Sequence, residues 1–164
     1  MKTVARKILI AALILVALIF KLTEQKIFVA AEINHELEIL TTVDADKKTS
    51  LVIHFIHSVQ KTPVIEELEF DGEDFILLRT RYKSHGVGLP FMESDGVFRE
   101  EGGWFVMDEM NRRIKNLSLR TGVGTQLTLE LGGETFELYK KYPAGTKIVI
   151  DSASAWKIFR LTVH

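Results

Sequence analysis

After the first 22 residues, apolar and polar side chains alternate along the chain, and this alternation constrains the fold more than any other feature. Turn-forming residues interrupt it at intervals of about eight to twelve positions, a spacing typical of sandwiches and barrels built from short strands. Beyond the N-terminal segment we find no convincing amphipathic helix pattern. The sequence therefore predicts an all-β fold, an antiparallel sandwich or barrel, preceded by one N-terminal membrane-anchor helix.

The clearest hairpin signal is Gly132-Gly133, which lies between Thr125–Leu131 and Glu134–Tyr139. Taken as a two-residue loop, it pairs Leu129 with Phe136, so that apolar side chains meet across the strands. A second hairpin is predicted around Asp71-Gly72. Other expected strands are Glu36–Thr42, Leu51–His57, Val64–Phe70, Phe75–Arg81, Trp104–Met107, Ile114–Arg120, Lys147–Ile150 and Trp156–Val163.

The N-terminus indicates where the chain is sent. Three basic residues lie within residues 1–7, Ile8–Phe20 contains no polar side chain, and Lys21 closes the run. A basic head followed by an apolar run is typical of an export or membrane-anchor signal, and the basic cluster stays in the cytoplasm. We expect a retained single-pass anchor in the cell membrane with the rest of the chain extracytoplasmic. The alternative is a secreted protein cleaved near Val29–Ala31.

Length and charge narrow the classes of protein further. We expect a signal-anchor helix at residues 1–22, a stalk or first strand at 23–35, and an extracytoplasmic β-domain at 36–164. The chain has no cysteine, so neither disulfides nor thiolate metal sites hold the fold. Four of the 21 basic residues lie at or before Lys21, which leaves 17 basic and 22 acidic side chains beyond it. Such a balance gives no long-range attraction to nucleic acid, and we expect no nucleic-acid partner.

Glu66 has an unusual place in the alternation. In an extended strand it points to the same side as Val64 and Leu68, whereas Glu67 and Glu69 point to the other, wetter side. Glu66 would then be a carboxylate on a face that otherwise buries apolar groups, where a charge needs a partner or must be neutralised. The alternative is an edge-strand glutamate that reaches solvent.

The partner of Glu66 depends on the length of the preceding turn. A two-residue turn at Asp71-Gly72 places Glu66 diagonally from Arg79, within reach of a long side chain. A three-residue turn leaves His57 or Lys61 as the nearest candidate. The sequence leaves both possibilities open.

Basic residues alternate just after this hairpin. Arg79, Arg81, Lys83 and His85 would share one face of a strand, and the chain then enters the glycine-rich segment Gly86–Pro90. Successive backbone N–H groups in such a turn can form an anion nest, so this region could bind a carboxylate or phosphate. The alternative is a solvated strand face that ends in an ordinary loop.

The candidate binding residues from this reasoning are His57, Ser58, Glu66, Arg79, Arg81, Tyr82, Ser84, Gly86, Gly88 and Pro90. His54 and His57 are three apart and face opposite sides of a regular strand, so we expect no metal site and no cofactor. Ser84 lacks a nucleophile-elbow pattern, and we assign no catalytic residue.

Two blocks carry a resemblance to a known family. His57-Ser58-Val59, followed by Pro63 and Glu66, and Gly88-Leu89-Pro90 after Tyr82 resemble the motifs of the family called domain of unknown function 1850. The resemblance extends over roughly residues 37–163. It implies a small exported or membrane-anchored bacterial protein whose gene often lies beside those of TAXI-type TRAP transporters, which take up organic acids with a separate binding protein. It assigns no activity to any residue.

Three hypotheses follow. The first is a non-enzymatic accessory or binding module of a TRAP-type carboxylate uptake system, which contacts transporter subunits or a small carboxylate and is held by its N-terminal helix in the membrane. The second is an exported hydrolase or metal-dependent enzyme that uses the region of His57, Glu66 and Ser84. The third is a purely structural role, in which the polar residues fix the register of the strands.

Overall fold

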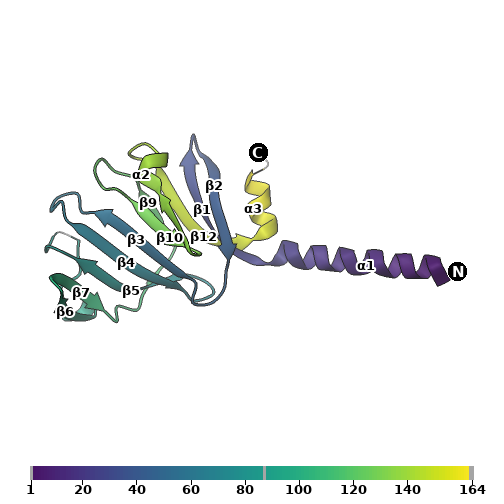
Figure 1. Ribbon diagram of the computed structural model, residues 1–164, viewed down its shortest axis with the longest axis horizontal. Helices are drawn as coiled ribbons and strands as arrows, with labels where there is room; N and C mark the ends of the chain where they lie inside the picture. The colour runs from purple at the N-terminus through teal and green to yellow at the C-terminus, as the bar shows by residue number, and fades with distance from the viewer. Residues whose placement is uncertain (1, 87, 163–164) are drawn as a thin grey trace.

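The computed structural model describes residues 2–86 and 88–162. Within these residues a long N-terminal helix precedes two antiparallel β-sheets (Figure 1). The predicted all-β fold with antiparallel strands behind one helix is confirmed.

The elements follow one another closely along the chain. The helical elements are α1 (Lys2–Thr23), the short 3-10 helix η1 (Glu93–Asp95), α2 (Leu138–Lys141) and α3 (Ala155–Thr162). The strands are β1 (Gln25–Ile33), β2 (Glu36–Asp44), β3 (Ser50–Ile56), β4 (Pro63–Phe70), β5 (Phe75–Tyr82), β6 (Val97–Glu101), β7 (Trp104–Asp108), β8 (Arg112–Ile114), β9 (Ser118–Arg120), β10 (Thr128–Leu131), β11 (Glu134–Glu137) and β12 (Lys147–Ser154).

The strands of the described residues divide between a four-stranded and an eight-stranded sheet. The four-stranded sheet has the order β2-β1-β12-β9. The eight-stranded sheet has the order β11-β10-β3-β4-β5-β7-β6, and β8 also pairs with β5. One edge of β5 is therefore shared, with residues 75–77 beside β8 and residues 80–82 beside β7.

The main core lies between the two sheets. Its buried side chains include Ile27, Val29, Ala31, Ile148 and Ile150 from the four-stranded sheet and Leu51, Ile53, Leu68, Phe70, Phe75, Leu77, Leu129 and Leu131 from the eight-stranded sheet. Full burial of each large apolar side chain contributes about 1.5–3 kcal/mol. Packing of this kind must stabilise a chain that has no cysteine to cross-link it.

β1 is apolar on both faces. Ile27 and Val29 enter the core between the sheets, whereas Phe28 and Ala30 pack on the opposite face against Ile158 of α3. A strand that is covered on both faces has a continuous apolar sequence, as residues 27–31 do.

The predicted closing strand Trp156–Val163 is wrong: residues 155–162 form α3, and Val163 lies outside the described residues. The expectation that no amphipathic helix follows the N-terminal segment is wrong for the same reason. The Ser154 hydroxyl accepts a hydrogen bond from the Lys157 backbone N–H at 3.3 Å, which caps the helix. Ile158 then faces the sheet, and its burial fixes the helix there.

The predicted register of the Gly132-Gly133 hairpin is confirmed, with Leu129 opposite Phe136. Gly132 has φ +62°, and a Cβ at this position would lie 2.6 Å from a side-chain carbon of Val43 on β2. A side chain at Gly132 would therefore require Val43 of the other sheet to shift.

The predicted strand Ile114–Arg120 is divided between the two sheets. β8 ends at Ile114 and pairs with β5, whereas β9 begins at Ser118 and pairs with β12. Leu117 lies at the crossing point and is buried in the core.

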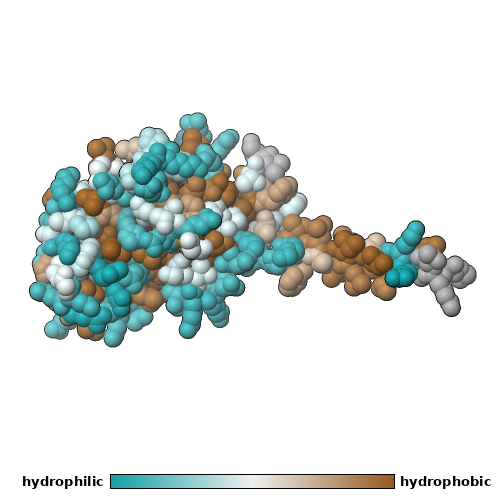
Figure 2. All heavy atoms as spheres, in the orientation of Figure 1, coloured by the Kyte–Doolittle hydropathy of each residue, from teal (hydrophilic) through white to brown (hydrophobic). Residues whose placement is uncertain are grey.

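α1 projects away from the sheets, and a single residue, Glu24, separates it from β1 (Figure 1). The apolar side chains along residues 8–20 face outward and form a continuous hydrophobic surface (Figure 2). Among the helices of the described residues, none combines the length and apolar content that a membrane crossing requires.

Candidate functional site

A β-bulge at Leu78 determines where the charged residues of β4 and β5 point. Glu67 pairs with Arg79 and Leu68 pairs with Leu77, so Leu78 has no partner on β4. An extra residue on one strand reverses the side to which all later side chains point. Before the bulge Leu77 faces the core, and after it Arg79 and Arg81 face away.

The predicted turn at Asp71-Gly72 is longer than two or three residues. Residues 71–74 form it, and the Asp71 carboxylate accepts hydrogen bonds from the backbone N–H groups of Glu73 and Asp74, each at 2.9 Å. With the bulge, this turn sets Glu66 opposite Thr80 rather than diagonally from Arg79. The predicted placement of Arg79 beside Glu66 is therefore wrong.

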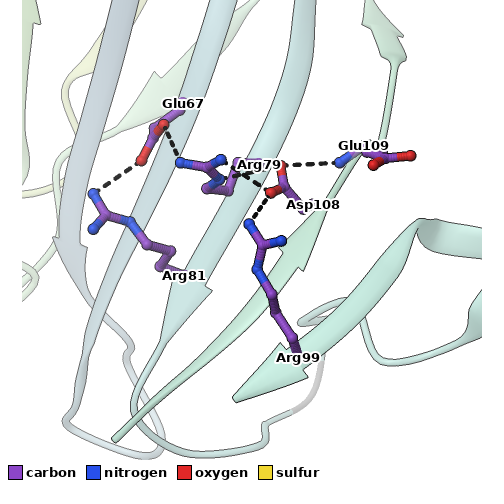
Figure 3. Close-up of polar contacts among 6 residues, drawn as sticks. All are labelled: Glu67, Arg79, Arg81, Arg99, Asp108 and Glu109. Carbon is purple, nitrogen blue, oxygen red and sulfur yellow. Dashed lines mark hydrogen bonds and ion pairs between the residues drawn. The ribbon is translucent and has the colours of Figure 1, made fainter. Parts of the chain in front are cut away.

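The residues that face away from the core form an ion-pair cluster, which we call the arginine cluster: Glu67, Arg79, Arg81, Arg99 and Asp108 (Figure 3). Arg79 donates from Nε and Nη2 to the two carboxylate oxygens of Asp108, at 3.1 and 2.9 Å. Its Nη1 lies 3.4 Å from Glu67, and Arg81 Nη2 lies 2.9 Å from the same carboxylate. Arg99 also contacts Asp108.

Asp108 is the most constrained member of the cluster. The hydrogen bond from Arg79 lowers the pKa of Asp108 below its ordinary value, with further support from the Glu109 backbone N–H at 3.1 Å. Figure 3 shows the Glu109 carboxylate directed away from the arginines. The cluster thus combines three guanidinium groups with two carboxylates and carries an excess positive charge.

A pocket of about 330 Å³ lies beside the arginine cluster. It is lined by Arg79, Arg81, Glu101, Trp104 and Val106. The Arg81 Nε is buried and donates to no acceptor among the described residues. Guanidinium groups recognise carboxylates through paired N–H donors, and the partly exposed ring of Trp104 suits a hydrocarbon chain.

Lys83 lies over the ring of Trp104, one of the residues that line the pocket. Its Nζ lies 4.3 Å from the centre of the Trp104 ring and 3.0 Å from the Gly103 carbonyl oxygen, to which it donates. The cation holds the indole in place and adds to the positive charge near the pocket.

A larger hollow, of about 730 Å³, lies elsewhere, between residues 33–39 and residues 160–162. Its lining includes Glu36 and Glu38 as well as His35 and Arg160, so the charges of the two carboxylates oppose those of the basic groups. This composition offers no concentrated attraction for an anion. The pocket beside the arginine cluster is therefore the stronger candidate for binding an anion.

Glu66 is partly buried on the core side of β4. Burial raises the pKa of its carboxyl, and the charge of Arg112 on β8 opposes that rise. Among the described residues, no hydrogen bond or ion pair to the Glu66 side chain is present. The cation that acts on it is thus Arg112, and not His57 or Lys61 as a three-residue turn had suggested.

Tyr82 stabilises the glycine-rich turn. Its side chain is fully buried, and its hydroxyl donates to the Pro90 carbonyl oxygen at 2.5 Å. Leu89 packs beside Tyr82 and its N–H donates to the Gly86 carbonyl oxygen at 3.1 Å. Gly88 has φ +85°, which favours glycine. Val87, which the sequence places in the same turn, lies outside the described residues.

His57 organises the loop between β3 and β4. Its Nδ1 accepts hydrogen bonds from the backbone N–H groups of Val59 and Gln60, both at 3.2 Å. The backbone N–H of His57 donates to the Thr62 carbonyl oxygen at 2.9 Å. The imidazole is buried and the neighbouring Ser58 is exposed. Both motif blocks thus contain residues that fix loops.

The structure separates the predicted candidates into two groups. Arg79 and Arg81 line the pocket, whereas Glu66 and Tyr82 point to the opposite side of β5 and β4. In the described part of the chain, no hydrogen bond joins Ser84 to His57 or Glu66. No group of three or more histidine and carboxylate side chains there is placed to hold a metal ion.

The sequence reasoning missed two residues of this region, Asp108 and Trp104. The signal that could have found them is Gly102-Gly103, which joins β6 to β7 and pairs Arg99 with Val106. A glycine pair between two short strands predicts a hairpin, and this one brings Trp104 and Asp108 beside the arginines.

Comparison with known proteins gives one family. The sequence profile of a family described as a domain of unknown function, DUF1850, matches residues 51–138. This span begins within β3 and ends at the first residue of α2, so it includes the arginine cluster and its pocket. It is narrower than the resemblance over residues 37–163. No curated protein and no solved structure gives a significant match.

Proposed function

Because the chain belongs to the DUF1850 family, whose profile covers more than half of it, we propose that it is a non-enzymatic, membrane-anchored extracytoplasmic module that binds a small carboxylate for a TAXI-type TRAP uptake system. The observation that carries this proposal is the pocket beside the arginine cluster. The link to a transporter comes from the family resemblance.

The chemistry of the pocket suits a carboxylate with a short hydrocarbon chain. Arg79 and Arg81 supply cationic donors at one side, and the partly exposed ring of Trp104 supplies apolar surface. Three guanidinium groups face the carboxylates of Glu67, Asp108 and Glu101, so it is Lys83 beside Trp104 that leaves a net positive charge at this site, within a domain that is otherwise net acidic. Glu101 lies on the same lining and would favour ligands that carry a hydroxyl or amino group besides their carboxylate.

The N-terminal helix supports a position at the cell membrane. Its apolar side chains along residues 8–20 are exposed, and basic residues precede them. The apolar run of residues 8–20 is shorter than an ordinary span, so anchoring requires the long side chains of Lys7 and Lys21 to reach the headgroups at its two ends. With the basic residues on the cytoplasmic side, the sheets would lie outside.

Retention of the helix is favoured over cleavage. The candidate cleavage site Val29–Ala31 lies in the fully buried part of β1. Cutting there would remove most of a strand that pairs with both β2 and β12. A folded domain therefore needs the segment that follows α1.

Ligand binding can be tested by thermal unfolding and calorimetry of the full chain in detergent. Succinate is the probe and succinamide is its uncharged control. At a hundredfold excess over the dissociation constant, a ligand stabilises the native state by about 2.7 kcal/mol. For a chain of this size that corresponds to a rise in melting temperature of about 5–10 °C.

A matched pair of variants locates the site. Arg81→Gln should abolish the succinate effect, whereas Arg120→Gln on β9, whose side chain donates to the Gly145 carbonyl oxygen, should retain it. A panel of C3 to C6 mono- and dicarboxylates that produces no stabilisation would overturn carboxylate binding. Cross-linking in native membranes tests the partner, and recovery of no transporter subunit would overturn the link to uptake.

A further inference from the structure

α3 presents an unusual set of side chains to solvent. Trp156 and Phe159 are 49% and 53% exposed, and their rings stack at a centroid distance of 5.8 Å. Lys157 and Arg160 are exposed next to them. Successive residues of a helix lie about 100° apart, so Ile158 alone among these five turns toward the sheet. The outer face of α3 therefore consists of two aromatic and two basic side chains.

The position of α3 relates this face to α1. The backbone N–H of Ala155 donates to the Glu24 carbonyl oxygen at 2.9 Å, directly after the end of α1. α3 lies on the side of the sheets from which α1 departs, and it runs across the direction of α1 (Figure 1). A bilayer that takes up the apolar residues of α1 would lie against this side and parallel to α3.

We propose that α3 is an interfacial helix, in which Trp156 and Phe159 enter the headgroup region of the bilayer and Lys157 and Arg160 contact anionic lipid phosphates. The inference shares with the proposed function the placement of α1 in the membrane. It is independent of the pocket beside the arginine cluster.

The composition of α3 favours a lipid surface over a protein partner. Tryptophan and other amphipathic aromatic residues accumulate at membrane–water interfaces, and basic side chains beside them bind anionic headgroups. α3 contains no acidic residue that anionic lipids would repel. A helix of eight residues is about 12 Å long, which is short for the roughly 800 Å² that each partner buries in a stable protein complex.

Two single-tryptophan variants test the inference, because the chain contains two tryptophans. Trp104→Phe leaves Trp156 as the reporter. Trp156→Phe leaves Trp104, which lines the pocket beside the arginine cluster. The full chain of each variant is reconstituted in phosphatidylcholine–phosphatidylglycerol vesicles. These contain lipids with bromine atoms either near the headgroup or near the ends of the acyl chains. Trp104→Tyr replaces Trp104→Phe if circular dichroism shows that the latter does not fold.

The expected result is a loss of about half of the Trp156 emission with bromines near the headgroup, a smaller loss with deep bromines, and no change for Trp104. Trp156 should also become protected from aqueous iodide on reconstitution. Unquenched Trp156 in chains that remain bound to the vesicles would overturn the interfacial role of α3 alone. Chains that do not bind vesicles would overturn both this role and the anchoring by α1. Carboxylate binding, measured in detergent, would be unaffected by either outcome.

Discussion

Replacing Tyr82 with phenylalanine should lower the free energy of unfolding by about 1–2 kcal/mol. The change removes the hydroxyl that donates to the Pro90 carbonyl oxygen at 2.5 Å and leaves the buried ring in place. No cavity of consequence forms, so the effect reports on the hydrogen bond and on the acceptor that loses it.

The magnitude follows from the surroundings of the two groups. A neutral hydrogen bond contributes about 0.5–1.5 kcal/mol net, and a buried acceptor left without a donor costs about 1–3 kcal/mol. Pro90 is only partly buried, so water can replace part of what its carbonyl loses. At about 2–4 °C per kcal/mol, the melting temperature should fall by roughly 2–8 °C.

Tyr139→Phe is the matched control. Its hydroxyl also donates a hydrogen bond, to the Glu137 carboxylate at 3.0 Å, but this pair is exposed on the surface. Its loss should change the free energy of unfolding by less than about 0.5 kcal/mol. Urea titrations of the three proteins measure the difference. Chymotrypsin provides a local probe, since a loosened turn should be cut faster after the exposed Phe91.

Equal stability of Tyr82→Phe and the unmodified protein would refute the reasoning. It would mean that the glycine-rich turn of residues 86–90 is held by other contacts. The same conclusion would follow if Tyr139→Phe destabilised the protein as much as Tyr82→Phe did.

Three further perturbations probe other contacts. Glu66→Gln should stabilise the protein at about pH 8 and flatten its pH dependence, because burial raises the pKa of Glu66 and native stability is lost as pH rises through that pKa. Urea titrations at about pH 5 and pH 8 measure both effects. If the free energy of unfolding changed with pH as much in Glu66→Gln as in the unmodified protein, the reasoning would be contradicted. Asp108→Asn should cost on the order of 1 kcal/mol at neutral pH, since Arg79 loses a charged acceptor. Because Arg79 lowers the pKa of Asp108, that stabilisation disappears as pH falls through the lowered value, and thermal melts should converge in acid. Gly132→Ala should destabilise more than Gly133→Ala by roughly 1 kcal/mol, because a Cβ collides with β2 only at the first position. Similar melting temperatures for the two glycine variants would rule out that collision.

The features that the sequence predicted correctly are local ones. Alternation over β3, β4 and β5 identified the all-β fold, and the apolar pairing of Leu129 with Phe136 identified the register of a hairpin. Both depend on residues that are close in the chain. The outward direction of Glu67 was also correct, because its neighbours alternate regularly.

The features that the sequence did not predict depend on contacts between residues that are far apart in the chain. The bulge at Leu78 goes with a change of partner on β5, from β8 to β7, and the Met110 N–H donates to the Leu78 carbonyl oxygen at 3.1 Å. Nothing in the alternation of β5 indicates that one residue is skipped. α3 is short, and only the Ser154 cap and the burial of Ile158 distinguish it from a strand.

Only part of the candidate site could be predicted, because some of its contacts join residues that are far apart in the chain. Arg79 and Arg81 were identified from their own spacing, but their direction depends on the bulge and their partner Asp108 depends on β7. Glu66 was correctly placed among apolar neighbours, and its charged neighbour Arg112 comes from a three-residue strand that periodicity does not reveal.

The division of the core between the sheets limits how far the chain can be shortened. The matched span 51–138 omits β1, β2, β12 and α3, and with them Ile27, Val29, Ile148 and Ile150. A fragment cut at those limits would expose to water the apolar face of the sheet that it retains. Such a fragment should aggregate or unfold when expressed alone. The smallest part of this protein that folds independently is therefore considerably larger than the segment that the family profile matches.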